Sequence, residues 1–321
     1  MQPTVRWGVL SAAKIAREWL CPAIHNSSQG VITAIASRTP GKAEALAAPY
    51  GDVKCHSSYE ALLADPNVDA IYIPLPNLGH VEWTEKALRA GKHVLCEKPI
   101  ALEAAQIDGL IKLRDQTKLV AAEAFMVTHH PQWHRVRALL AEGAIGKLRH
   151  VQGAFSFYND DVANIRNDAS QAGGALRDIG VYPSVVTRFA TGEEPTAISS
   201  RIDWDNGIDA TARVWAEFPG FSIDFYVSMR MHPLQQMIFH GDAGWIRVAT
   251  PFNAKAYGDD VIELRDRSGV VKTERFPLVD QYRVQIDNFN TSVLTGAPYL
   301  CPLEFSRGNQ AMIDMIYEAA R

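Results

Sequence analysis

The sequence predicts an α/β protein in which a doubly wound parallel sheet is followed by an α+β domain with a large, open, mostly antiparallel sheet. At least five short apolar stretches alternate with helical ones before Ala124, which is typical of a parallel sheet with helices on both faces. After that residue, strand-like stretches follow one another with little helix between them, which indicates antiparallel pairing. We therefore expect one domain over residues 1–124 and a second over 125–321.

The composition agrees with two ordinary globular domains. The chain has 321 residues, 47% of them hydrophobic and 21% charged, whereas single cores stop growing at roughly 250–300 residues. With a formal net charge of −4, it lacks the basic balance of nucleic-acid-binding proteins. No apolar run reaches the roughly 18 residues of a membrane span, and the first residues show no signal-peptide pattern. The cysteines lie far apart without metal-binding spacing, at Cys21, Cys55, Cys96 and Cys301. We expect reduced thiols and a cytoplasmic protein that binds neither nucleic acid nor membrane.

Local signals place the elements of the first domain in order. Strands are expected at 5–10, 31–37, 70–74, 94–96 and 119–123. Helices are expected from 11 to about 27, after 42, over 59–64, up to about 90 and over 103–116. Ser58 stands where a helix cap is expected, and Gly91 stands where a glycine would end a helix.

The second domain begins with a predicted helix over 131–142. Large and small side chains alternate from Leu148 onward, and a loop over 159–173 leads into a helix over 174–188. Further strands are expected at 196–205, 210–218, 221–230, 235–241 and 244–249, and helices at 282–295 and 302–320. One wide sheet face is left over in this arrangement, so we expect dimerisation through it.

The first strand-to-helix turn has the position of a dinucleotide site, where amides at a helix N-terminus hold phosphates. The glycine places of G-x-G-x-x-G hold Ser11, Ala13 and Ala16, so only the small size is kept and the motif alone is weak. The second strand ends in Ser37-Arg38 and carries no carboxylate. Arginine suits a 2′-phosphate, which favours NADP(H) over NAD(H); the alternative is a solvated loop arginine.

Residues 93–99, His-Val-Leu-Cys-Glu-Lys-Pro, form a buried strand that ends in charged residues. Pro99 cannot extend the strand, so Lys98 lies where strand becomes loop. Ligands of open parallel sheets bind beyond the carboxyl ends of the strands. Glu97 and Lys98 are therefore placed for chemistry, although an adjacent Glu-Lys pair is also compatible with a surface turn.

Asp178 and Tyr182 lie four residues apart on a predicted helix, so their side chains share one face. A tyrosine hydroxyl has a pKa of roughly 10, and a nearby ammonium lowers it. Lys98 is the candidate ammonium, and Asp178 could orient a substrate hydroxyl or balance the charge of the lysine. Taken singly, these residues favour a packed helix tyrosine and an aspartate in a surface pair; taken together, Lys98, Asp178 and Tyr182 favour a catalytic set.

Three motifs carry a resemblance to a known family: Pro-Asn-Leu-Gly-His over 76–80, Ala-Gly-Lys-His-Val-Leu-Cys-Glu-Lys-Pro over 90–99, and Gly-Gly-Ala-Leu-Arg-Asp-Ile-Gly-Val-Tyr over 173–182. With these, the sequence resembles the glucose–fructose oxidoreductase/inositol dehydrogenase/rhizopine-catabolism (Gfo/Idh/MocA) family of NAD(P)-dependent oxidoreductases. It is similar to the branch of dimeric dihydrodiol dehydrogenases and NADP-dependent sugar dehydrogenases. The resemblance implies a Rossmann domain that binds the dinucleotide and a second domain that binds the substrate and dimerises through its sheet.

The resemblance also implies roles for individual residues. Lys98 would lie beside nicotinamide and substrate, Tyr182 would donate or accept the proton, and Asp178 would be its substrate-binding companion. Cofactor contacts would come from Ser11, Ala12, Ala13, Lys14, Ile15, Ser37, Arg38, Leu75, Asn77, His80, Glu97, Lys98, Glu123 and Arg166. The histidines His129, His130 and His134 diverge and have no carboxylate at ligand spacing, so we expect no metal.

The implied reaction is hydride transfer between NADP(H) and a carbinol or carbonyl of a sugar, polyol or dihydrodiol-type substrate. A homodimer or a dimer of dimers is expected. One alternative is a nicotinamide-dependent glycosidase, but the Asp-Ile-Gly-Val-Tyr sequence favours a dehydrogenase. The other is a non-catalytic NADP-binding regulatory protein, which the presence of Lys98, Asp178 and Tyr182 together argues against.

Overall fold

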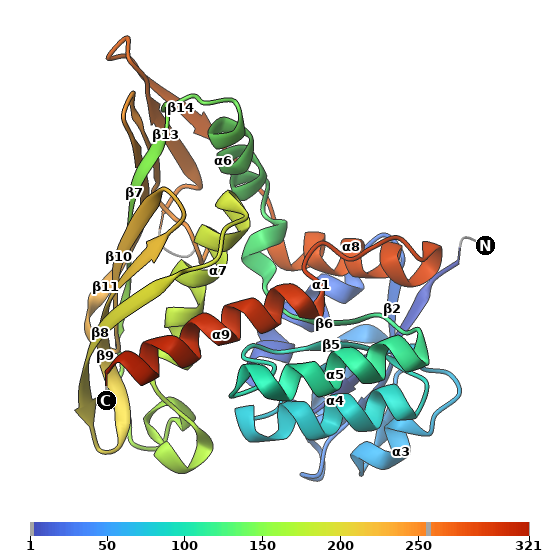
Figure 1. The fold of residues 1–321 in the computed structure, drawn as a ribbon. Coiled ribbons are helices and arrows are strands. Elements are labelled where there is room, and N and C mark those ends of the chain that lie inside the picture. The colour runs from blue at the N-terminus through green and yellow to red at the C-terminus, as the bar shows by residue number, and fades with distance from the viewer. Residues whose placement is uncertain (1–2, 255–257, 321) are drawn as a thin grey trace. The chain divides into compact units, whose positions relative to one another are not determined.

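A computed structural model describes residues 3–254 and 258–320. The chain forms two compact units (Figure 1). The first contains the residues up to Met126 together with Asp280–Arg307, and the second contains Val127–Val279 and the residues from Gly308 onward. Residues 280–307 thus return to the first unit after the strands of the second, and the residues from Gly308 onward return to the second. The predicted roles of 1–124 and 125–321 as cofactor and substrate domains remain a prediction.

The first unit is built on a six-stranded parallel sheet with the order β3-β2-β1-β4-β5-β6. Its strands are β1 (Val5–Leu10), β2 (Gly30–Ala36), β3 (Lys54–His56), β4 (Ala70–Ile73), β5 (His93–Cys96) and β6 (Ala121–Glu123). The order reverses between β1 and β4, which is the arrangement of a doubly wound sheet. The predicted fold class is confirmed, and β3 is a strand that the prediction lacked.

Helices cover both faces of this sheet. They are a π-helical turn (Ala16–Leu20), α1 (Cys21–His25), α2 (Lys42–Ala47), α3 (Tyr59–Leu63), α4 (His80–Arg89), α5 (Ala104–Thr117), α8 (Gln281–Thr295) and the start of α9 (Leu303–Ala319). Buried residues of α3, α4 and α5 share one core cluster with alternate strand residues such as Ile71 and Ile73, because strand side chains alternate between faces. On the other face, the ring of Trp7 lies 5.1 Å from that of Phe289 in α8.

Two predicted helix boundaries are confirmed by their capping geometry. The hydroxyl of Ser58 accepts the amide hydrogen of Ala61 at 3.1 Å, which caps α3. After α4, Gly91 has a φ of 76°, the left-handed conformation in which a glycine commonly ends a helix.

The second unit is built on an eight-stranded sheet with the order β14-β13-β12-β11-β7-β10-β9-β8. The strands are β7 (Leu148–Tyr158), β8 (Ala197–Asp205), β9 (Ile208–Phe218), β10 (Phe221–Ser228), β11 (Arg230–Gly241), β12 (Trp245–Val248), β13 (Val261–Arg265) and β14 (Val271–Arg275). All neighbours pair antiparallel except β7 and β10, which are parallel. The predicted large, mostly antiparallel sheet is therefore confirmed, whereas β13 and β14 were not predicted.

Helices α6 (Pro131–Ala141) and α7 (Val181–Thr191) pack against each other on one face of the eight-stranded sheet (Figure 1). Strand β10 shows why one face is covered and the other is not: Phe221, Ile223 and Phe225 are buried, and the residues between them are partly exposed. The end of α9 also lies on this sheet, where Ser200 donates to the carbonyl of Ile316. The opposite face carries no helix in the part of the chain that the structure describes.

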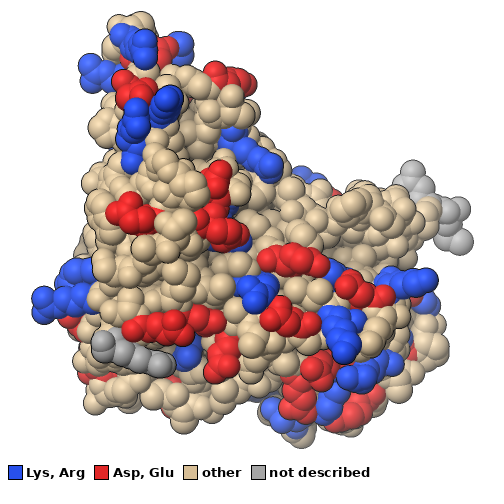
Figure 2. Space-filling view, viewed as in Figure 1, with Lys and Arg blue, Asp and Glu red and all other residues tan. Residues whose placement is uncertain are grey.

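No helix among the described residues combines the length and hydropathy that a membrane crossing requires. On the face of the molecule shown in Figure 2, basic and acidic side chains are interspersed. This distribution agrees with the small net charge of the chain.

Candidate active site

The predicted cofactor residues of the first unit lie at one edge of its sheet. Each follows the carboxyl end of a parallel strand, and such ends share an edge. Residues 11–15 follow β1, Ser37 and Arg38 follow β2, residues 75–80 follow β4, Glu97 and Lys98 follow β5, and Glu123 ends β6. The structure thus places at one edge of the sheet the residues that the sequence predicts to bind the nucleotide.

The first turn keeps the backbone of a glycine fingerprint without its glycines. Ser11 occupies the first glycine place with a φ of 125°, a conformation that side chains other than glycine adopt only at a cost. The helical turn that follows begins at Ala16. A strained backbone at this turn agrees with a predicted phosphate-binding role.

Arg38 is positioned by an aromatic ring beneath it. Its guanidinium carbon lies 5.1 Å from the ring centre of Tyr59, a cation–π geometry. The hydroxyl of the buried Ser37 accepts the Thr39 amide hydrogen at 3.1 Å and turns the loop. The exposed guanidinium is thereby held at the end of β2, where a 2′-phosphate would be recognised.

Polar groups surround the turn that carries Lys98. Tyr72, which the sequence reasoning missed, donates its hydroxyl to Glu97 Oε1 at 2.7 Å, and Glu97 Oε2 accepts the Lys98 amide hydrogen at 3.3 Å. Glu123 is buried and accepts the amide hydrogen of Ile100 at 2.9 Å. Burial raises the pKa of Glu123 to about 7, and the charge of Glu97 acts in the same direction. The ring nitrogens of His80 lie 2.7 Å from the carbonyl oxygens of Pro99 and Leu75.

In the second unit, the structure brings Asp178 and Tyr182 together with Arg166. Arg166 Nε donates to Asp178 Oδ2 at 2.6 Å, and the charge of Asp178 raises the pKa of Arg166. Tyr182 is buried, with its ring 5.7 Å from that of Phe155 and 5.6 Å from that of Phe252. A phenol, a carboxylate and a guanidinium in this arrangement can move a proton and bind hydroxyl groups.

Asp209, which the sequence reasoning missed, holds the start of the π-helical turn (Leu176–Gly180) that contains Asp178 and leads into α7. Its buried carboxylate accepts the Leu176 amide hydrogen at 2.6 Å and the Tyr317 hydroxyl at 2.8 Å. Gly174 has a φ of 125°, and a Cβ there would collide with this carboxylate. Burial raises the pKa of Asp209 to about 6. In the sequence, Asp209 could have been noticed only as a carboxylate within the largely apolar stretch that forms β9.

The three neighbouring histidines differ in burial: His129 and His130 are buried, and His134 is exposed. Burial lowers the pKa of His129 to about 3. His130 Nδ1 accepts the Gln132 amide hydrogen at 3.1 Å, and the ring of His134 meets that of Phe189 edge-on. Over residues 3–254 and 258–320, no group of three or more His, Cys, Asp or Glu side chains could hold a metal ion.

The predicted catalytic residues belong to different units: Lys98 lies in the first, and Asp178 and Tyr182 lie in the second. That these three residues act together on a substrate therefore remains a prediction. Arg166, predicted as a cofactor contact, forms an ion pair with the predicted substrate-binding aspartate.

Comparison with known proteins agrees with this geometry. A family model described as an oxidoreductase family with an NAD-binding Rossmann fold matches residues 5–125. A second model, described as the GFO/IDH/MocA C-terminal domain, matches residues 133–247. The first match lies in the first unit of the fold and the second lies in the second unit.

Full-length relatives extend these matches. An uncharacterised oxidoreductase of Rhizobium meliloti is 37% identical over 98% of this chain and 97% of its own. The D-xylose 1-dehydrogenase (NADP(+)) 2 of Haloferax volcanii is 32% identical, covering 98% and 97%. A 3-ketoreductase of Actinomadura kijaniata, crystallised with NADP and TDP-benzene, has a TM-score of 0.91 at 30% identity, covering 99% and 98%. The NADP in that crystal agrees with the predicted cofactor, and the predicted resemblance is confirmed. The chain belongs to the glucose–fructose oxidoreductase/inositol dehydrogenase/rhizopine-catabolism (GFO/IDH/MocA) family of nicotinamide-dependent oxidoreductases.

Proposed function

We propose that this protein transfers a hydride between NADP(H) and a carbonyl or carbinol carbon of a sugar, polyol or dihydrodiol-type substrate. The observation that carries the proposal is the buried phenol of Tyr182 in α7, which directly follows the π-helical turn (Leu176–Gly180) that contains Asp178. The carboxylate of Asp178 is held by Arg166 at 2.6 Å. Relatives named as a sugar dehydrogenase and as a ketoreductase crystallised with a nucleotide ligand support this substrate class.

When bound, NADP(H) would supply or accept the hydride. In the reducing direction, Tyr182 gives its hydroxyl proton to the carbonyl oxygen of the substrate. Lys98 contributes a positive charge that stabilises developing negative charge on oxygen. Asp178 accepts a hydrogen bond from a substrate hydroxyl while Arg166 fixes its orientation. The reverse reaction oxidises a carbinol through the same groups.

Arg38 and Ser37 support NADP(H) as the cofactor. Arg38 presents five N–H donors at the ribose end of the predicted site, and no carboxylate stands in the Ser37-Arg38 pair to bind a 2′-hydroxyl. The guanidinium already rests over Tyr59, so less side-chain entropy is lost when a phosphate binds.

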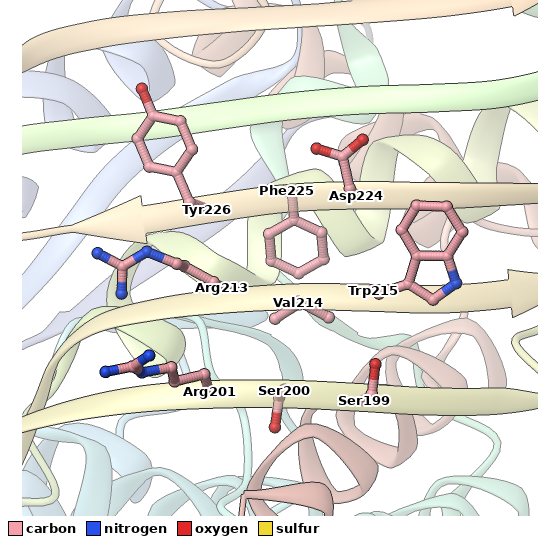
Figure 3. A pocket seen from close by; sticks show the side chains of 9 residues that line it. All are labelled: Ser199, Ser200, Arg201, Arg213, Val214, Trp215, Asp224, Phe225 and Tyr226. Atoms are coloured by element: carbon pink, nitrogen blue, oxygen red, sulfur yellow. The ribbon is translucent and has the colours of Figure 1, made fainter.

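The uncovered face of the eight-stranded sheet supports dimerisation. Figure 3 shows the side chains that line a pocket on β8, β9 and β10: Ser199, Ser200, Arg201, Arg213, Val214, Trp215, Asp224, Phe225 and Tyr226. Trp215 is 43% exposed, and its ring stacks on His150 at 5.3 Å. Aromatic and arginine side chains are typical of protein interfaces, so a second copy of this chain is the proposed occupant.

The test is the absorbance change of NADPH and NADP⁺ with aldoses, ketosugars, diols and dicarbonyls. Lys98→Ala and Tyr182→Phe are each expected to lower kcat on the order of 100-fold or more while NADPH binding stays largely intact. An unchanged kcat would remove the substituted residue from the mechanism. Tight NADPH binding without turnover of any substrate by the wild type would instead favour a glycosidase with a closed redox cycle or a regulatory protein.

A further inference from the structure

The peptide group that directly follows Lys98-Pro99 is held on both sides by buried ionisable side chains. Its N–H, on Ile100, donates to Glu123 Oε1 at 2.9 Å. Its carbonyl, on Pro99, lies 2.7 Å from Nδ1 of His80. Glu123 is 3% exposed and His80 is 1% exposed, so neither group exchanges its partner for water.

The two side chains reach this peptide from different segments of the first unit. Glu123 is the last residue of β6, the neighbour of β5 in the sheet. His80 begins α4, and its other ring nitrogen lies 2.7 Å from the carbonyl of Leu75, in the loop after β4. The turn that carries Lys98 is thereby joined to the ends of both strands that flank β5.

The charge of Lys98 acts on both side chains that hold this peptide, His80 and Glu123. Its positive charge lowers the pKa of His80, in addition to the larger effect of burial. The same charge partly opposes the rise in the pKa of Glu123 that burial causes. Glu123 and His80 therefore contact the peptide group that follows Lys98, close to its ammonium.

We propose that Glu123 and His80 are positioning residues that clamp the Pro99–Ile100 peptide and so fix the place of the Lys98 ammonium. This inference rests on the proposed function for its kinetic consequence, although not for its structural one. A displacement of about 1 Å in a catalytic group costs on the order of 100-fold in rate. A side chain that fixes the turn therefore influences kcat without touching the substrate.

Glu123→Leu removes the acceptor and keeps an apolar side chain of similar size, whereas Glu123→Gln keeps an oxygen that can accept the Ile100 N–H. We expect Glu123→Leu to raise amide hydrogen exchange in residues 98–101 at least tenfold. We expect kcat to fall at least tenfold. Glu123→Gln is expected to restore most of both losses. His80→Phe, which keeps a ring and loses both nitrogens, is expected to resemble Glu123→Leu.

Asp65→Asn is the matched control. Asp65 is a buried carboxylate of the same unit, bonded to Asn67 and His56. The backbone carbonyl of Asp65 accepts a hydrogen bond from Lys92, which precedes β5. Lys98 follows that strand, at its other end. Loss of the Asp65 carboxylate is expected to leave exchange in residues 98–101 unchanged.

Unchanged exchange at residues 98–101 in a folded Glu123→Leu protein would overturn the clamp. So would a kcat equal to that of the wild type, or a Gln variant no better than the Leu variant. If the wild type turns over no substrate, the proposed function fails on its own, because the exchange measurement needs neither substrate nor turnover.

Discussion

The buried carboxylate of Asp209 makes a prediction about stability that can be worked out from the structure. In Asp209→Asn, the amide oxygen can accept the Leu176 N–H, and the amide nitrogen can donate to the Tyr317 hydroxyl, which then acts as acceptor. The substitution therefore keeps both hydrogen bonds and removes the charge. It isolates the cost of ionising this carboxyl group inside the second unit.

Burial raises the pKa of Asp209 from its ordinary value of 3.8 to about 6. As the pH rises from 4 to 6, the unfolded carboxyl group ionises before the folded one, so the folded state loses stability over this window. Each pH unit corresponds to about 1.4 kcal/mol, and the whole window to about 3 kcal/mol. The Asn variant does not ionise. Its free energy of unfolding, compared with that of the wild type, should therefore improve by about 3 kcal/mol between pH 4 and pH 7.

Urea denaturation of both proteins between pH 4 and pH 7 measures this difference. The control Asp52→Asn replaces an exposed carboxylate. Its free energy of unfolding should differ from that of the wild type by less than about 0.5 kcal/mol at any pH. A wild-type and an Asn curve that stay parallel across the range would refute the reasoning, because the Asp209 carboxyl group would then ionise equally easily in both states.

Two further predictions concern the cofactor and the assembly. Arg38→Ala should weaken NADPH binding by roughly 10–100-fold, because charge-assisted hydrogen bonds to the phosphate are lost, and should leave NADH binding nearly unchanged. Fluorescence titration measures both affinities, and equal losses would contradict a 2′-phosphate contact. Trp215→Glu should convert a dimer into monomers in sedimentation experiments because it places a charge on the uncovered sheet face, whereas Leu278→Glu, at an exposed position outside the sheet, should not. A wild type that sediments as a monomer would also contradict the proposed interface.

The first unit was largely predictable because its strands are apolar and end in turn residues. Strands β4 (Ala70–Ile73) and β5 (His93–Cys96) lie where the apolar runs predicted them, at 70–74 and 94–96. Strand β3 was missed because Lys54-Cys55-His56 has a single apolar residue and no alternation to detect. Its strand conformation depends on pairing with β2, which is a tertiary contact.

The second sheet shows the same limit at its edge. The residues of β14 are mostly exposed on both faces. Because neither face packs against a core, the sequence of this strand shows no alternation of apolar and polar residues. The parallel pairing of β7 with β10 joins residues about 70 positions apart, such as His150 and Ser222, and no local pattern encodes it.

The site divides in a similar way. Arg38 and Lys98 could be placed because each follows the end of a parallel strand. The contacts of His80 with two backbone carbonyls, and of Asp209 with a backbone amide, could not be inferred. They depend on where distant backbone segments lie, and backbone carbonyls and amides are the same at every position in the sequence.

The return of residues 280–307 to the first unit has a consequence for biosynthesis. The indole of Trp7 donates to the side chain of Asn290 at 2.9 Å, across 283 positions of the chain, and Leu303 completes the core cluster beside α5. A ribosome adds residues from the N-terminus, so the part of the first unit that is made first lacks these partners until the strands of the second unit have been synthesised. The nucleotide-binding half should therefore mature after, rather than before, the strands of the second unit. Prematurely terminated chains should then be substrates for proteolysis instead of stable NADPH-binding fragments.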